Sequence, residues 1–430
     1  MYNDGPYANQ ETTVKLRTAL LVFIAAAPCA FGQPPAAPPT PAPAAAPGRV
    51  APIVSPEVAP DGAVTFRLRA PNAKEVYVSG IGRPTAPVAS GAPGGARLDM
   101  QKNEQGIWTV TTPDPMKPGI YQYTFNVDGL RIPDPGNNKF QTGFNSASSS
   151  RLVVPGGLWT PAPGIARGAV TRHFFHSTIA GDDRDFWVYT PAGYDARRKE
   201  QYPVFVLLHG LGDEANSWME NGAANAILDN LIAQGKAKPM VMVNTLGYGY
   251  PNGPSGAMRE GMLDNFGKIV LQEVLPIVEQ NYNVAKTPGM RAIAGLSMGG
   301  AEATLTGLNH LDTFAYVGSF SGAYVMWPGA MPPATPGAGP GAGGPREISK
   351  ETIAKVFPAL DEKANARLKL LWITCGTADS LVGVNRTFRE WLDAKGVKNT
   401  YVEVPDIGHV WPFWRQNLAD FAPLLFQTAK

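Results

Sequence analysis

Apolar and polar residues alternate along the chain from about residue 52 to residue 155. The alternation is clearest in four short segments, each typical of a strand with one buried face: 63–69, 75–79, 108–111 and 121–127. Glycine, proline and Asn/Asp turns separate them. Short strands at this spacing predict a small all-β sandwich over residues 52–155.

From residue 171 the pattern changes to short apolar runs separated by helical stretches. The predicted strands are 171–176, 185–189, 204–208, 240–244, 291–296, 316–320, 368–374 and 400–404. The predicted helices are 223–233, 266–280, 301–308, 350–356, 386–394 and 414–427. Strands that alternate with helices predict an α/β domain, with a mostly parallel sheet and helices on both faces.

The N-terminal segment is typical of a secretory signal peptide. Lys15 and Arg17 precede an apolar run at 19–27, and the small residues of 30–32 fit a cleavage site. The run is too short to span a bilayer. We therefore expect a secreted or periplasmic protein without a membrane span. The predicted order is a signal peptide (1–32), a Pro/Ala-rich linker (33–51), the β-sandwich (52–155), a second linker (156–170) and the α/β domain (171–430).

The charge and the cysteine and histidine content argue against several classes of function. A net charge of +2 with 17% charged residues gives no electrostatic basis for binding nucleic acid. Of the two cysteines, Cys29 lies in the predicted signal peptide, so Cys375 has no partner for a disulfide and is expected to be a buried structural thiol. The five histidines and two cysteines show no metal-ligand spacing, so we expect neither a metal nor another cofactor.

A candidate nucleophile lies between a predicted strand and a predicted helix. The segment Gly295-Leu-Ser-Met-Gly299 follows the apolar run 291–296 and precedes a helix. G-x-S-x-G in this setting is the nucleophile elbow, a sharp turn that holds the serine hydroxyl clear of the sheet. We predict that Ser297 is the nucleophile and that the α/β domain has the α/β-hydrolase fold. The alternative is an ordinary glycine-rich turn.

A serine hydroxyl needs a base and an acid, which follow the nucleophile in the order acid, then histidine, in this fold. His310 closes the helix after the elbow and is expected to face away from Ser297, so His409, in a loop after the last strand, is the predicted base. Asp379 lies beyond the carboxyl end of strand 368–374 and is the predicted acid. Asp406, three residues before His409, is the rival.

Acyl transfer also requires hydrogen-bond donors for the developing oxyanion. The backbone N–H of Met298, directly after the nucleophile, is one expected donor. The strand 204–208 runs into His209-Gly210, so the N–H of Leu211 is the expected second donor. We expect His209 to shape this loop rather than transfer protons.

Several motifs in the α/β domain resemble those of carbohydrate esterase family 1, which contains feruloyl and acetylxylan esterases. They are 208–212, 216–218, 224–232, 291–300, 314–316, 375–379 and 408–409. The resemblance implies Ser297, Asp379 and His409 as nucleophile, acid and base. It also implies an ester-bearing small molecule or plant cell-wall polysaccharide as substrate. Trilactone-siderophore esterases and mycolyl transferases share this fold.

The β-sandwich resembles the early-set domains that precede glycan-active enzymes, of the family 48 carbohydrate-binding module type. The matching segments are 55–58, 66–71, 106–108 and 119–123. Glycan contact through Trp108 and Tyr123 is one interpretation, and packing of both rings in the core is the favoured one.

The acyl preference depends on aromatic residues near the predicted triad. Trp218, Trp411 and Trp414, with Phe413, either hold an aromatic acyl group or belong to the core. We favour a feruloyl over an acetyl ester. A Gly/Pro-rich insert at 331–345 departs from the family pattern, so the resemblance does not predict which residues form the rim of the pocket. The remaining alternatives are an acyltransferase and a glycan-binding protein on a hydrolase scaffold.

Overall fold

The computed structural model describes residues 52–81, 96–143, 149–251, 253–256, 259, 261–330 and 347–427, all within one compact unit. The expected signal peptide (1–32), the Pro/Ala-rich linker (33–51) and the insert at 331–345 lie outside the described residues. None of the described helices is long and apolar enough to cross a bilayer.

The first part of the described chain is a β-sandwich. One sheet has the order β1-β2-β6-β5, and the other has the order β4-β3-β7-β8 with β9 also paired to β7. Inward-facing residues of both sheets share one apolar core. The strands are β1 (Glu57–Val58), β2 (Val64–Arg69), β3 (Val76–Ile81), β4 (Ala96–Asp99), β5 (Gln101–Lys102), β6 (Ile107–Thr111), β7 (Gly119–Val127), β8 (Leu130–Ile132) and β9 (Ser150–Val154).

Both aromatic residues singled out in the sandwich belong to its core. Trp108 is 7% exposed and its indole donates to the Ala70 carbonyl, while Tyr123 is 1% exposed and its hydroxyl donates to Asp134. Neither ring is available to stack on a sugar in this conformation. The favoured interpretation, core packing, holds for both.

The second part is built on an eight-stranded sheet with the order β10-β11-β13-β12-β14-β15-β16-β17. The pairs β10–β11 and β11–β13 are antiparallel, and every later pair is parallel. The sheet is therefore mostly parallel, as expected. Its strands are β10 (Ala169–Ser177), β11 (Asp182–Thr190), β12 (Val204–Leu208), β13 (Val241–Thr245), β14 (Arg291–Leu296), β15 (Tyr316–Phe320), β16 (Leu370–Gly376) and β17 (Thr400–Val404).

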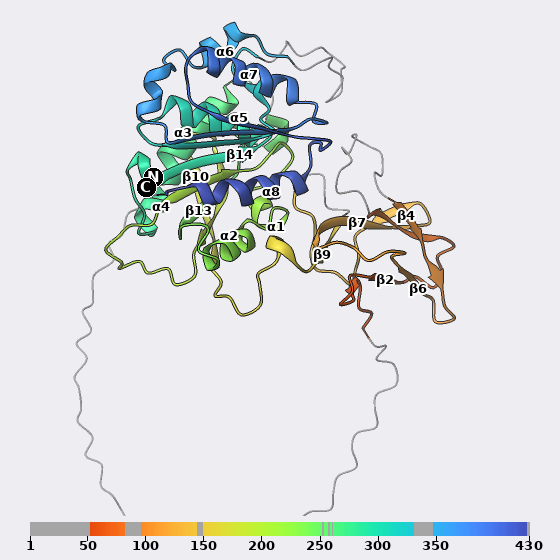
Figure 1. Ribbon diagram of the computed structural model, residues 1–430. Helices are drawn as coiled ribbons and strands as arrows, with labels where there is room; N and C mark the ends of the chain where they lie inside the picture. Colours follow the sequence, from red (N-terminus) through yellow and green to blue (C-terminus); the bar gives the residue numbers. More distant parts are fainter. Residues whose placement is uncertain are drawn as a thin grey trace, which may run out of the picture. The chain divides into compact units, whose positions relative to one another are not determined.

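Helices cover both faces of this sheet (Figure 1). One apolar core packs α3 (Met262–Ile269), α5 (Met298–Asn309), α6 (Lys350–Val356) and α7 (Val382–Ala394) on one face. A second core packs α1 (Ser217–Glu220), α2 (Ala224–Ala233) and α8 (Trp411–Phe421) on the other. The central strands β12 and β14 are buried along their whole length because both faces are covered.

Five of the six predicted helices differ from their predicted bounds. Helix α2 begins one residue later than predicted, at Ala224, and α7 begins four residues earlier, at Val382. The predicted helix 266–280 is α3, a π-helical turn (Val270–Val274) and α4 (Leu275–Asn281). Helix α5 begins directly at Met298, because the elbow turns straight into it. Helix α8 begins at Trp411 rather than residue 414, with Pro412 in its first turn, where a missing N–H costs no hydrogen bond.

The sandwich and the α/β part are joined by hydrogen bonds. The Thr142 N–H donates to the side-chain oxygen of Asn221, whose amide nitrogen donates back to the Thr142 carbonyl. Arg415, in α8, donates to the Asn221 carbonyl and to the Ile120 carbonyl of β7. These bonds attach the sandwich next to α1 and α8.

Candidate active site

The turn between β14 and α5 has the geometry of a nucleophile elbow. Ser297 has φ 53° and ψ −115°, which is a strained conformation for a residue with a Cβ atom. The neighbouring glycines make the turn sterically possible. A Cβ atom on Gly295 would lie 2.4 Å from the backbone of Gly299, and one on Gly299 would lie 2.5 Å from the His209 carbonyl oxygen. Strand, helix and the β12 loop can therefore meet only where side chains are absent.

Three side chains that are distant in sequence form one hydrogen-bonded line. Ser297 Oγ lies 3.0 Å from His409 Nε2, and His409 Nδ1 lies 2.7 Å from Asp379 Oδ2. Each residue follows the carboxyl end of a parallel strand: β14 precedes Ser297, β16 precedes Asp379 and β17 precedes His409. The arrangement can pass the serine proton to the imidazole, whose other nitrogen is held by a carboxylate.

Asp379 remains ionised in this setting. Its side chain is fully buried, which by itself favours the neutral acid. The hydrogen bond and charge of His409, the Leu381 N–H and the Ser321 hydroxyl outweigh burial and hold the pKa of Asp379 below its usual value. The buried carboxylate is therefore able to fix the tautomer and orientation of the histidine.

The two rival residues lie apart from this line. Asp406 is exposed, and its backbone N–H donates to the Thr377 hydroxyl in the turn before His409. His310 is exposed at the far end of α5, thirteen positions after Ser297. Neither side chain has a hydrogen bond to the triad residues among the described interactions.

The loop after β12 contains Leu211, the expected second oxyanion donor. This loop lies against the nucleophile, as that role requires. A Cβ atom on Gly210 would lie 3.3 Å from Ser297 Cβ. His209 is buried, and burial lowers its pKa to about 4. The neutral ring donates from Nδ1 to the Gly210 carbonyl and accepts from the Gly247 N–H at Nε2, 2.8 Å in each case. His209 therefore ties this loop to the loop after β13, and among the described hydrogen bonds its ring has none to a triad residue.

Tyr248 is a second residue that holds this loop, and sequence reasoning did not find it. Its hydroxyl accepts from the Gly212 N–H at 2.8 Å and donates to the Asp213 carbonyl at 3.1 Å. These two bonds flank Leu211, whose backbone N–H is the expected oxyanion donor. A tyrosine in a glycine-rich loop carries no recognisable motif, so the contact is visible only in three dimensions.

Removing the Tyr248 hydroxyl is expected to slow turnover without weakening substrate binding. In Tyr248→Phe the ring still fills its site, but the Gly212 N–H loses its acceptor and the loop becomes less fixed. We expect kcat to fall about tenfold, since a misplaced oxyanion donor costs part of the 10²–10³ that its removal costs. KM for a small ester should stay within about twofold. Steady-state kinetics measure kcat and KM separately. A rise of about tenfold in KM with an unchanged kcat would contradict the prediction.

Two carboxyl groups near the loop, that of the fully buried Glu302 and that of the partly buried Asp213, were also missed. Glu302, in α5, is fully buried, neither of its carboxyl oxygens has a hydrogen-bond partner among the described residues, and burial raises its pKa well above the usual value. Burial also raises the pKa of Asp213 to about 7. Burial therefore favours the neutral, protonated form of Glu302. Its Oε2 would lie 3.2 Å from a Cβ atom on Gly247, the residue that donates to His209.

The three tryptophans of the predicted rim occupy different depths. Trp218 is fully buried, and its indole donates to the Leu208 carbonyl at 2.7 Å. Trp414 is 6% exposed and packs edge-on against the His409 ring. Only Trp411 is partly exposed, and its ring packs edge-on against both of the others. In this conformation Trp218 and Trp414 support Trp411 and do not themselves line a surface for substrate.

A metal ion or a reactive thiol would be another source of chemistry at this site. Within the described residues there is no group of three or more His, Cys, Asp or Glu side chains placed to hold a metal ion. Cys375 lies inside β16, fully buried, and burial raises the pKa of its thiol. It is the buried structural thiol that its position on an apolar strand predicts.

Fold and site together define an α/β-hydrolase with a serine, histidine and aspartate arrangement. The esterase family, described as putative esterases, matches residues 177–425. The chain belongs to the esterase family, as a feruloyl-esterase-like member of carbohydrate esterase family 1.

Relatives and solved structures agree with this placement. The endo-1,4-beta-xylanase/feruloyl esterase of Xylanibacter ruminicola is 32% identical over 85% of this chain, which spans 45% of that protein. A ferulic acid esterase of the anaerobic fungus Anaeromyces mucronatus aligns with a TM-score of 0.51 at 25% identity, over 64% of this chain and 96% of its own. The enterobactin esterase of Shigella flexneri aligns with a TM-score of 0.54 at 20% identity, over 84% of this chain and 93% of its own, and shows the shared fold.

Proposed function

We propose that the protein is a serine carboxylic-ester hydrolase that acts through an acyl-enzyme and releases feruloyl groups from plant cell-wall polysaccharide. The observation that carries the proposal is the line of hydrogen bonds from Ser297 through His409 to Asp379. The feruloyl esterase names of the Xylanibacter ruminicola and Anaeromyces mucronatus relatives support the acyl group.

The geometry suits a two-step reaction. Ser297 Oγ attacks the ester carbonyl carbon while His409 Nε2 takes its proton, and the Asp379 carboxylate stabilises the resulting imidazolium. The backbone N–H groups of Leu211 and Met298 stabilise the oxyanion. His409 then returns the proton to the leaving sugar hydroxyl. Water, activated by the same histidine, releases the acid and restores the serine.

An aromatic acyl group fits the apolar surface beside the triad. Trp411, two residues from His409, is partly exposed, and Leu211 in the oxyanion loop is 48% exposed. Trp218 and Trp414 hold the Trp411 ring from behind. A flat aromatic acid gains contact with such a fixed ring, whereas an acetyl group is too small to reach it.

The site of action and the role of the sandwich belong to the same proposal. Lys15, Arg17 and the apolar run that follows support export of the chain, which brings it to a polymeric substrate. The buried positions of Trp108 and Tyr123 give no support to sugar stacking on those rings. We therefore place substrate recognition on the α/β part.

The triad argues against one of two alternatives and does not separate the other. A glycan-binding protein on an inactive hydrolase scaffold has no need of an ionised Asp379 hydrogen-bonded to His409. An acyltransferase shares every triad contact and differs only in the acceptor, a sugar hydroxyl instead of water, that resolves the acyl-enzyme.

Rates on two substrates test the acyl preference. We expect methyl ferulate to be hydrolysed at least tenfold more efficiently than acetylated xylan, in kcat/KM per ester, because burying an aromatic ring contributes more than about 1.4 kcal/mol. Product release by the mature protein is measured by chromatography. Trp411→Ala should lower the ferulate rate and leave acetate release unchanged. Acetate release alone would assign a small acyl pocket instead.

A further inference from the structure

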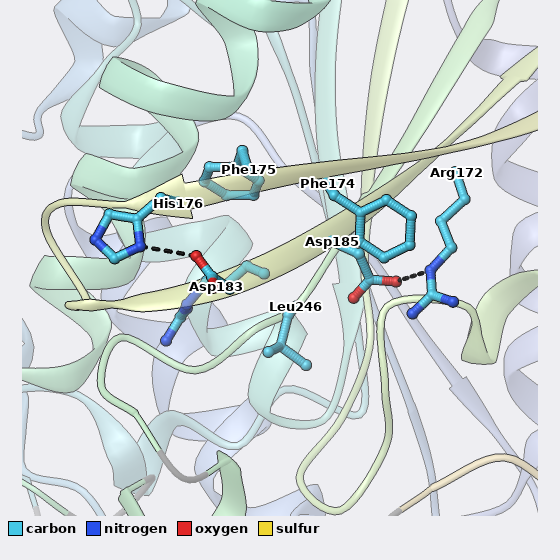
Figure 2. Close-up of a pocket in the computed structure, with 8 residues that line it drawn as sticks. Arg172, Phe174, Phe175, His176, Asp183, Asp185 and Leu246 are labelled. Atoms are coloured by element: carbon cyan, nitrogen blue, oxygen red, sulfur yellow. Dashed lines mark hydrogen bonds and ion pairs between the residues drawn. The ribbon is translucent and has the colours of Figure 1, made fainter.

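A cavity of about 580 Å³ lies on the α/β part, outside the triad (Figure 2). It is lined mainly by the β10–β11 hairpin, with Leu246 from the end of β13. Figure 2 shows Arg172 and Phe174 on one side and His176 with Asp183 on the other. Its lining is therefore part aromatic and part charged, and the triad chemistry uses none of it.

The aromatic side of the cavity is unusually open. Phe174 is 72% exposed, the most exposed large hydrophobic side chain among the described residues. The Arg172 guanidinium lies 4.5 Å from the centre of its ring and 5.4 Å from the Trp187 ring. A large exposed ring on an edge strand, with a cation held against it, is a surface that gains from being covered. Flat pyranose and furanose faces stack on such rings.

The polar groups of the cavity match the hydroxyl groups of a sugar. Asp185 Oδ2 holds Arg172 Nε at 2.8 Å and also accepts from the Trp187 indole. The two terminal nitrogens of Arg172 have no hydrogen-bond partner within the part of the chain that is described, so they are free to donate. Asp183, whose side chain is 91% exposed, accepts from His176 and has a second oxygen left over. Donors and acceptors thus lie on both sides of the ring.

The cavity and the nucleophile share one edge of the sheet. Strand β10 runs parallel to β13, because both are antiparallel to β11. The strand registers place His173 level with Thr245 and with Gly295, so the cavity residues after His173 reach the level of Ser297. Four inter-strand steps separate β10 from β14, which is roughly 19 Å at about 4.8 Å per step. That distance is spanned by several sugar units of one polymer.

A buried arginine connects the cavity wall to the loop near the nucleophile. Arg184 lines the cavity and donates to the carbonyl oxygens of Tyr248 and Tyr250. The Tyr248 hydroxyl in turn accepts from Gly212 beside the expected oxyanion donor. One set of hydrogen bonds therefore connects the cavity wall with the loop that contains the expected oxyanion donor.

We propose that this cavity is a distal glycan subsite, in which Phe174 stacks on a sugar of the polysaccharide backbone and Arg172 and Asp183 bond its hydroxyls. The ester carried by the same polymer then reaches Ser297. The inference rests on the proposed function for the identity of the polymer. The subsite is a second binding site for the substrate. Because it lies at the edge of the sheet, away from Ser297, it favours a polymeric substrate over a small ester.

The test compares a polymer with a small ester. In Phe174→Ala we expect kcat/KM on feruloylated arabinoxylan to fall about tenfold, as loss of one stacked ring predicts. Methyl ferulate should be hydrolysed within about twofold of wild type, because the triad is unchanged. Arg172→Gln should act the same way. Val170→Ala, at an exposed position of the same strand outside the cavity, is the matched control and should change neither rate.

Calorimetry with Ser297→Ala and arabinoxylan oligosaccharides that carry no feruloyl group separates this inference from the proposed function. Binding that is lost on adding Phe174→Ala supports the subsite, even if wild type fails on methyl ferulate. Equal rates of wild type and Phe174→Ala on polymer, with normal methyl ferulate turnover, overturn the subsite alone. A wild-type dimer that Phe174→Ala dissociates in light scattering also overturns it, since β10 then pairs with a second copy.

Discussion

Ser297→Ala is expected to lose essentially all esterase activity while the protein remains folded. Without Oγ no acyl-enzyme forms, and kcat should fall on the order of 10⁵- to 10⁶-fold, as when the nucleophile of a triad is removed. The residual rate comes from binding and from the oxyanion donors, which the substitution leaves in place. Release of ferulate from methyl ferulate, followed over hours at high enzyme concentration, measures the loss.

The backbone at this position provides an internal control for folding. Alanine keeps the Cβ atom, so the strain at φ 53° remains and the free energy of unfolding should change by less than about 1 kcal/mol. Ser297→Gly is equally inactive, but relief of strain should leave it at least as stable as Ser297→Ala. Ser349→Ala, at the N-cap of α6, should remain fully active. Near-wild-type turnover by Ser297→Ala would exclude this serine as the nucleophile.

The parts of the site that sequence could predict are those that a local pattern encodes. Gly295, Ser297 and Gly299 occupy one turn. The spacing of the two glycines around the serine already indicates that this turn has no room for side chains at their positions. The apolar runs of the central strands are equally local, so β12, β14 and β15 have their predicted bounds. The edge strand β17 also has its predicted bounds. Asp379 and His409 follow from the order of elements in the fold.

The parts that could not be predicted depend on long-range packing. The Tyr248 hydroxyl meets Gly212 only because β13 and β12 are neighbours in the sheet, which no local pattern records. Burial of Trp218 likewise depends on Trp411, almost 200 positions later, folding over it. The cavity at the β10–β11 hairpin arises at an edge strand, and the apolar run that predicted this strand at 171–176 did not show that it lies at the sheet edge.

Asp379→Asn is expected to reduce kcat about 10⁴-fold with little change in KM, the loss seen when a triad carboxylate becomes an amide. The Asp379 carboxylate accepts the Nδ1 proton of His409. An asparagine that turned its amide nitrogen toward Nδ1 would instead stabilise the tautomer with the proton on Nε2, which cannot accept from Ser297. Steady-state rates on methyl ferulate measure this loss. Ionisation of Asp379, favoured by its lowered pKa, contributes stability above the carboxyl's unfolded pKa that disappears as pH falls through the folded value.

Asp406→Asn is the matched control, because it changes an exposed carboxylate close to the same histidine in sequence. Its backbone N–H, which bonds the Thr377 hydroxyl, is unaffected by the substitution, so the turn before His409 should persist. We expect kcat within about threefold of wild type and an unchanged pH profile, since exposed charges contribute little. A larger loss in Asp406→Asn than in Asp379→Asn would transfer the role of the acid to Asp406. Rotation of His409 away from its 2.7 Å contact with Asp379 would then be required.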